Sequence, residues 1–140
     1  QHCENAEKVV NFLKKHKEVT KVIYSTEHEK KIADRAKQYL KGGNGPMVGI
    51  ELKGGIEAGK TFIESLKMFY HVANIGDARS LAIHPASTTH SQLNEKELAA
   101  SGVTQSYVRL CIGIEHIDDI IDDLDQALNK SSKGSLKAVS

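Results

Sequence analysis

Amphipathic helical segments alternate with short β-rich segments along most of this chain, and this alternation restricts the folds open to it. Apolar residues recur every three or four positions in the helical segments and alternate with polar ones in the others. The pattern predicts helices at 3–17, 27–40, 56–69, 94–100 and 116–129, and strands at 19–24, 47–53, 72–75, 80–83 and 107–114. Because the links are short, we expect an α/β fold of the α+β two-layer sandwich type, with a mostly antiparallel sheet and helices on one face.

Composition and charge narrow the function classes. The chain has 140 residues, of which 39% are hydrophobic and 26% charged, enough for one domain with a real core. The net charge of +1 and the lack of any long apolar stretch argue against a nucleic-acid partner and against a membrane. Cys3 and Cys111 are too few for a disulfide framework, so we expect a reducing, cytoplasmic location.

The ends of the chain lead to two expectations about its organisation. The chain begins at Gln1 rather than Met and has a helical pattern by Asn5, so we expect a piece of a longer protein. Residues 1–129 are expected to form the domain. Residues 130–140 are mostly Ser, Lys and Gly, and we expect them to be a flexible tail.

One literal motif predicts nucleotide binding. Residues 54–61 (GGIEAGKT) match the P-loop pattern G-x-x-x-x-G-K-[ST], follow a predicted strand and open a predicted helix. Against this interpretation, Glu57 would place a carboxylate among the phosphate-binding amides, and no later strand ends in an Asp that could hold a metal. A P-loop nucleotide-binding module remains the alternative from another functional class.

Arg109 is the other candidate, because it interrupts an apolar strand. Alternation places Val108, Leu110 and Ile112 on the core face and Arg109 on the opposite face. The side chain could extend to solvent, or its planar guanidinium could bind a carboxylate or phosphate through two parallel hydrogen bonds. These two interpretations are equally open.

The seven histidines are scattered along the sequence, and no pair of them has a third ligand at a usable spacing, so no metal site is expected.

Two segments carry a family resemblance. Residues 73–91 (ANIGDARSLAIHPASTTHS) and 108–115 (VRLCIGIE) resemble the C-terminal domain of the pyridoxal-phosphate enzymes of Cys/Met metabolism, most of all their O-acetylhomoserine sulfhydrylase members. The similarity extends from Asn5 to Leu128. It implies the small C-terminal domain of fold-type I pyridoxal-phosphate enzymes, and it makes the P-loop match a coincidence.

The resemblance also implies roles for individual residues. Arg109 corresponds to the arginine that holds the substrate α-carboxylate, and Asn74 stands beside that carboxylate. Arg79 occupies a position where sulfhydrylases have a basic residue and lyases tend to have Glu, so it is expected to tune the substrate side chain. Thr89 is expected near the same cleft. His84 and His90 belong to the motif, but the resemblance assigns them no role.

The activity implied belongs to a larger parent enzyme. Such an enzyme holds pyridoxal phosphate on a lysine of a separate large domain, and it replaces the acetate of O-acetylhomoserine with sulfide or methanethiol to give homocysteine or methionine. We expect no catalytic or cofactor-binding residue in this chain and no activity from it alone. The expected partners are the amino-acid substrate and the parent's own large domain, within a homotetramer. A methionine or cystathionine lyase of the same family is the nearer alternative.

Overall fold

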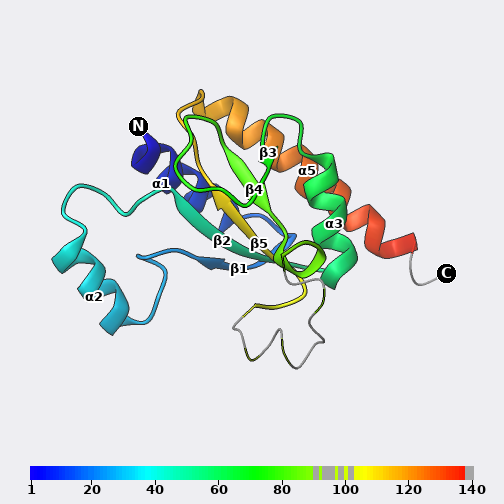
Figure 1. Cartoon of the computed structure of the whole chain (residues 1–140), viewed down its shortest axis with the longest axis horizontal. Coiled ribbons are helices and arrows are strands. Elements are labelled where there is room, and N and C mark those ends of the chain that lie inside the picture. The colour runs from blue at the N-terminus through cyan, green and yellow to red at the C-terminus, as the bar shows by residue number, and fades with distance from the viewer. Residues whose placement is uncertain (90–91, 93–96, 98–99, 101–102, 138–140) are drawn as a thin grey trace.

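The computed structural model describes residues 1–89, 92, 97, 100 and 103–137. Figure 1 shows a sheet with helices packed behind it. The elements in chain order are α1 (His2–Leu13), β1 (Val19–Ile23), α2 (Lys30–Tyr39), β2 (Met47–Leu52), α3 (Gly55–Ser65), β3 (Tyr70–His71), β4 (Leu81–Ile83), the 3₁₀ turn η1 (Pro85–Ser87), β5 (Tyr107–Cys111) and α5 (Ile117–Lys137). The predicted helix at 94–100 lies almost entirely outside the described residues.

The five strands form one sheet in the order β1-β2-β5-β4-β3. All neighbouring strands are antiparallel except β3 and β4, which run parallel. α1, α3 and α5 share one hydrophobic core with the sheet, whereas α2 stands apart from it at the left of Figure 1. The prediction of a two-layer α/β fold with a mostly antiparallel sheet is therefore confirmed.

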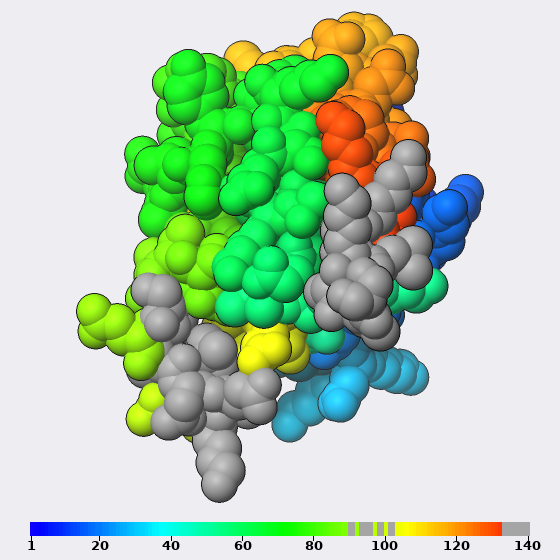
Figure 2. Space-filling view, turned by 90° about the vertical axis from the view of Figure 1, so that its right-hand side faces the viewer, coloured from blue at the N-terminus to red at the C-terminus, as the bar shows by residue number. Residues whose placement is uncertain are grey.

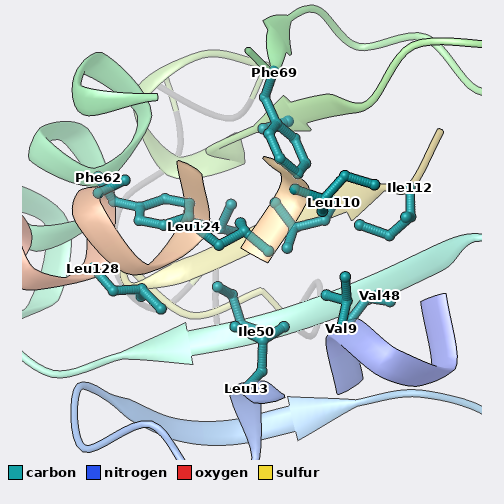
Figure 3. Packing of buried hydrophobic residues seen from close by; sticks show 14 of the residues in the cluster. Val9, Leu13, Val48, Ile50, Phe62, Phe69, Leu110, Ile112, Leu124 and Leu128 are labelled. Atoms are coloured by element: carbon teal, nitrogen blue, oxygen red, sulfur yellow. The ribbon is translucent and has the colours of Figure 1, made fainter. Parts of the chain in front are cut away.

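The core lies between the sheet and these three helices. Val48 and Ile50 on β2 and Val108 and Leu110 on β5 are fully buried, as the alternation along both strands predicts. They pack against buried residues of the helices, shown in Figure 3: Val9 and Leu13 of α1, Phe62 of α3, and Leu124 and Leu128 of α5. This packing fixes the orientation of β5 and therefore determines that Arg109 lies on the opposite face.

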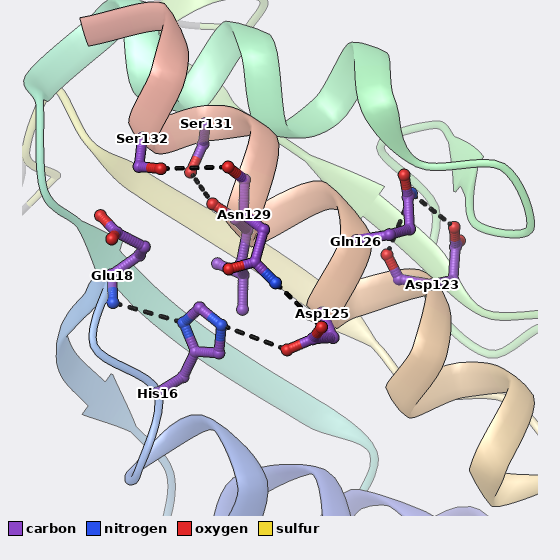
Figure 4. A network of polar contacts seen from close by, with 9 residues as sticks. His16, Glu18, Asp123, Asp125, Gln126, Asn129, Ser131 and Ser132 are labelled. Atoms are coloured by element: carbon purple, nitrogen blue, oxygen red, sulfur yellow. Dashed lines mark hydrogen bonds and ion pairs between the residues drawn. The ribbon is translucent and has the colours of Figure 1, made fainter. Parts of the chain in front are cut away.

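Polar contacts fix the position of α5 against its neighbours. The side chain of Asp123 accepts hydrogen bonds from the backbone amides of Lys67 (2.9 Å) and Met68 (2.8 Å), just after α3. Figure 2 shows α3 and the coloured part of α5 side by side on one face of the molecule. On the other side of α5, the ring of His16, which follows α1, lies 3.3 Å from the carboxylate of Asp125 (Figure 4).

Several boundaries differ from the prediction. α1 ends at Leu13 rather than at 17. Segment 72–75 is not a strand, because the chain leaves the sheet after His71 and turns through Gly76 at φ +85°. The expected tail is helical as far as Lys137, where fully buried Ser131 donates a hydrogen bond to the Leu128 carbonyl (2.7 Å).

Three large apolar residues are exposed rather than buried. Ile32 of α2 and Leu40, directly after it, are 45% and 44% exposed because this helix stands apart from the sheet. Ile114 is 50% exposed because β5 ends at Cys111 and the alternation ends with it. None of the helices in the described ranges combines the length and the apolar character that a membrane span requires.

Candidate substrate-carboxylate site

Arg109 lies in the middle of β5, where strands pair on both sides. Its backbone stands opposite Gly49 of β2 and Ile83 of β4. The side chain is half-buried on the face of the sheet that the helices leave uncovered. Tyr107 shares this face and lies across Gly49, where an added Cβ would come within 2.7 Å of the Tyr107 ring. Alternation along β5 therefore predicts the Arg109 face correctly.

Arg109 contacts a loop that is distant in the sequence. Its Nη2 donates a hydrogen bond to the backbone carbonyl of Asn74 at 3.3 Å. Asn74 is exposed, in the irregular segment between β3 and β4. The structure thus brings together the two residues that the resemblance assigns to the substrate carboxylate. A guanidinium at such a partly exposed position is suited to binding a carboxylate.

On its other side, Arg109 borders an open depression of about 210 Å³. The lining includes Ile23, Ser25, His28 and Tyr107 as well as Arg109. Burial raises the pKa of the Tyr107 hydroxyl, and the positive charge of Arg109 opposes this rise. Tyr107 therefore stays neutral near neutral pH, and its phenol places no negative charge beside Arg109.

Arg79 lies at the end of the same loop. Its guanidinium carbon sits 3.9 Å from the centre of the Tyr70 ring, and its Nε is 3.6 Å from the Asp77 carboxylate. The backbone amide of Arg79 donates to that carboxylate at 3.0 Å, which lowers the pKa of Asp77. Tyr70 and Asp77 thus orient the Arg79 guanidinium, which sequence reasoning did not anticipate.

The remaining motif residues are only partly described. Thr89 is exposed beyond η1, and its place in the cleft stays a prediction. His90 lies outside the described residues.

His84 is fully buried. One ring nitrogen, Nε2, donates to the Gln105 carbonyl at 2.7 Å, and the other, Nδ1, lies 2.8 Å from the Ser87 hydroxyl. Burial lowers the pKa of His84, so the ring is neutral near neutral pH.

The structure overturns the P-loop alternative. Helix α3 begins at Gly55, so Glu57, Gly59 and Lys60 already lie within helical turns rather than in a phosphate-wrapping loop. Gly59 faces the His84 ring, and Lys60 pairs with Glu57 at 2.8 Å. The glycine and the lysine of the motif therefore serve packing and an ion pair on the helix surface.

The cofactor implied by the resemblance does not fit the described residues. Every lysine whose exposure the structure gives is exposed except Lys60, and Lys60 is half-exposed and paired with Glu57. A lysine that holds a cofactor aldehyde needs a site enclosed around it, and the described part of the chain offers none for these lysines. The same part of the chain contains no group of three or more His, Cys, Asp or Glu that could hold a metal.

Comparison with known proteins identifies the family of this chain. Residues 1–129 match the family described as Cys/Met metabolism PLP-dependent enzyme. The chain is 50% identical over 129 residues to an O-acetyl-L-homoserine sulfhydrylase of Leptospira meyeri, covering 91% of this chain and 29% of that protein. It is 44% identical over 130 residues to an L-methionine gamma-lyase of Fusobacterium nucleatum, covering 93% of this chain and 33% of the relative.

Solved structures show the same fold. A putative O-acetylhomoserine (thiol)-lyase from Campylobacter jejuni superposes with a TM-score of 0.82 at 42% identity, over 91% of this chain and 30% of that chain. A cystathionine gamma synthase from Xanthomonas oryzae gives 0.81 at 31% identity, over 95% and 34%. The chain spans about a third of the length of these relatives. It belongs to the Cys/Met metabolism family of PLP-dependent enzymes and has the fold of their C-terminal domain.

Proposed function

We propose that this chain is the substrate-carboxylate-binding domain of a PLP-dependent O-acetylhomoserine sulfhydrylase. The observation that carries the proposal is the contact between Arg109 and Asn74, which joins two segments 35 residues apart at one exposed site. The 50% identity to a sulfhydrylase supports the choice of activity. The parent would replace the acetate of O-acetylhomoserine with sulfide or methanethiol and release homocysteine or methionine.

In this proposal the residues of the chain bind and orient the substrate. Arg109 forms two parallel hydrogen bonds to the α-carboxylate, and the Asn74 side-chain amide donates to the same group. Arg79, held by Tyr70 and Asp77, places a positive charge near the substrate side chain. The pyridoxal phosphate of the parent's large domain supplies an electron sink for the reaction. The proposal also includes a homotetrameric parent in the cytoplasm.

The test of this function is the substitution Arg109→Lys in the full-length parent. Lysine keeps the charge but provides a single point contact instead of a planar pair of donors. We expect KM for O-acetylhomoserine to rise at least tenfold, which corresponds to about 1.4 kcal/mol of binding. Steady-state kinetics with sulfide as the second substrate measure it. Arg35→Lys, on exposed α2, is the matched control, and an unchanged KM in Arg109→Lys would remove Arg109 from this role.

A methionine gamma-lyase is the second candidate, because the chain is 44% identical to one. The two activities diverge once the substrate side-chain group has departed. A sulfhydrylase adds a thiol, whereas a lyase releases a keto acid and ammonia. Incubating the parent separately with O-acetylhomoserine plus sulfide and with methionine alone distinguishes them. Homocysteine in the first reaction supports the proposal, and 2-oxobutanoate as the main product of the second favours the lyase.

A further inference from the structure

Ser80 is the centre of a buried hydrogen-bond network beside the carboxylate site. The residue is fully buried, directly before β4. Its backbone amide donates to one carboxylate oxygen of Glu115 at 2.6 Å, and its hydroxyl donates to the other at 3.0 Å. The same hydroxyl accepts a hydrogen bond from the Gly113 amide at 2.9 Å. One carboxylate therefore satisfies two donors of a residue that water does not reach.

The network joins the two segments that form the site. Ser80 ends the loop that carries Asn74 and Arg79, and Glu115 closely follows the strand that carries Arg109. A second link runs alongside, in which the Ile114 amide donates to the Ala78 carbonyl at 2.8 Å. The approach is close, since a Cβ added to Gly113 would lie 2.6 Å from the Arg79 carbonyl carbon. The position of the loop relative to β5 is therefore set at this junction.

α1 supports the network from the other side. Asn5 is fully buried, and its side-chain amide donates to the carbonyls of Gly113 (3.1 Å) and Glu115 (2.9 Å). The backbone of Glu115 is thus held by the core layer while its carboxylate holds Ser80. Because both its backbone and its carboxylate are held, Glu115 can fix the position of the loop relative to β5.

We propose that Glu115 is a positioning residue for the carboxylate site, acting through Ser80 to hold Asn74 within reach of Arg109. The inference rests on the proposed function, because it assigns Glu115 to the site that binds the substrate carboxylate. Glutamine keeps the shape of glutamate but carries an amide donor in place of one acceptor oxygen. Glu115→Gln can therefore no longer accept hydrogen bonds from both the amide and the hydroxyl of Ser80.

The experiment is NMR on the isotope-labelled 140-residue chain without any ligand. It follows two signals, the Asn74 backbone amide and the Arg109 side-chain Nε–H, alongside urea unfolding. We expect Glu115→Gln to shift both signals while leaving the amides of residues 67–69 in place. The matched control is Asp123→Asn, which weakens another carboxylate that accepts backbone amides, away from the site. It should shift residues 67–69 and leave Asn74 and Arg109 unchanged.

Ser80→Ala provides a milder second variant in case Glu115→Gln does not fold. It retains the Ser80 amide bond to Glu115 and removes only the hydroxyl, so it should move the same two signals by a smaller amount. Suppose that every one of Glu115→Gln and Ser80→Ala that folds lowers the free energy of unfolding, as Asp123→Asn does, but leaves the Asn74 and Arg109 signals unchanged. Glu115 then only stabilises the fold, and the proposal fails.

These results are independent of the proposed activity, because no substrate is present in the NMR measurement. Shifted Asn74 and Arg109 signals together with an unchanged KM in Arg109→Lys would uphold the positioning by Glu115 and reject the sulfhydrylase assignment. Unshifted signals with a raised KM would reject the positioning role and leave the assignment in place.

Discussion

At the scale of one residue, Gly59 explains why the P-loop pattern at residues 54–61 does not indicate nucleotide binding. A Cβ at this position would lie 2.7 Å from two carbons of the His84 ring, so only glycine lets helix α3 approach the buried imidazole. A glycine inside a helix normally costs about 1 kcal/mol relative to alanine. Here that cost is offset by the packing of His84, and phosphate binding is not needed to explain the glycine.

Gly59→Ala tests this explanation. Alanine favours the helix but forces the His84 ring to move in a packed core, so we expect a net loss of about 1–2 kcal/mol in the free energy of unfolding. Urea denaturation measures it. Gly42→Ala is the control, because no atom lies within 4 Å of the added Cβ there. Equal stability of the two variants would contradict the packing role of Gly59.

At the scale of elements, His84 links two segments separated by 21 residues. It follows β4, and its Nε2–H bonds to the carbonyl of Gln105 just before β5. The sequence identifies β5 and its two faces because alternation is local. It does not reveal this link or the contact of Arg109 with Asn74, because both depend on how the strands are ordered in the sheet. Helix α2 shows the converse: its apolar residues are evident in the sequence, but Ile32 remains 45% exposed.

His84 also predicts a pH dependence. Burial, reinforced by Lys60 and His71 and opposed by the Gln105 carbonyl and Glu57, lowers the pKa of His84 from its usual 6.5. Below about pH 6.5 the unfolded chain therefore binds more protons at this residue than the folded chain does. The stability from keeping His84 neutral is fully present above pH 6.5 and is lost as the pH falls toward the lowered pKa.

His84→Gln removes the titrating group and retains a donor for the Gln105 carbonyl. We expect the free energy of unfolding of this variant to fall less steeply than that of the wild type as the pH drops below 6.5. Urea unfolding at a series of pH values provides the comparison, and His28→Gln, at an exposed position, is the control. Parallel curves for His84→Gln and the wild type would show that His84 does not contribute in this way.

At the scale of the whole molecule, one hydrophobic core joins the sheet to α1, α3 and α5, and Arg109 lies outside that core. The fold class and the Arg109 face could be predicted because both depend on periodicity. The residues that orient the site, Tyr70, Ser80 and Glu115, could not be singled out, because their partners lie in other elements. Ser80 and Glu115 do fall in the family-like segments 73–91 and 108–115, which is the signal that the sequence offers for them.

The exposure of the lysines predicts how this chain binds pyridoxal phosphate. The lysines whose exposure the structure gives are exposed or, for Lys60, half-exposed and paired, so any pyridoxal phosphate they bind should dissociate on dialysis. Visible absorbance after dialysis measures the cofactor retained, and the full-length parent is the positive control. Cofactor retained at one equivalent per chain would mean that a lysine here has an enclosed site.

The middle position of β5 in the sheet has a consequence for ligand affinity. The backbone of Arg109 is held by strands on both sides, whereas Asn74 belongs to an exposed loop. In the proposed site a carboxylate binds between them, and most of the backbone entropy lost on binding belongs to the loop. Substitutions that stiffen this loop at positions other than Asn74 and Arg79 should therefore tighten binding without altering any group that the proposal places on the ligand. The loop, rather than the strand, determines the entropic cost of binding.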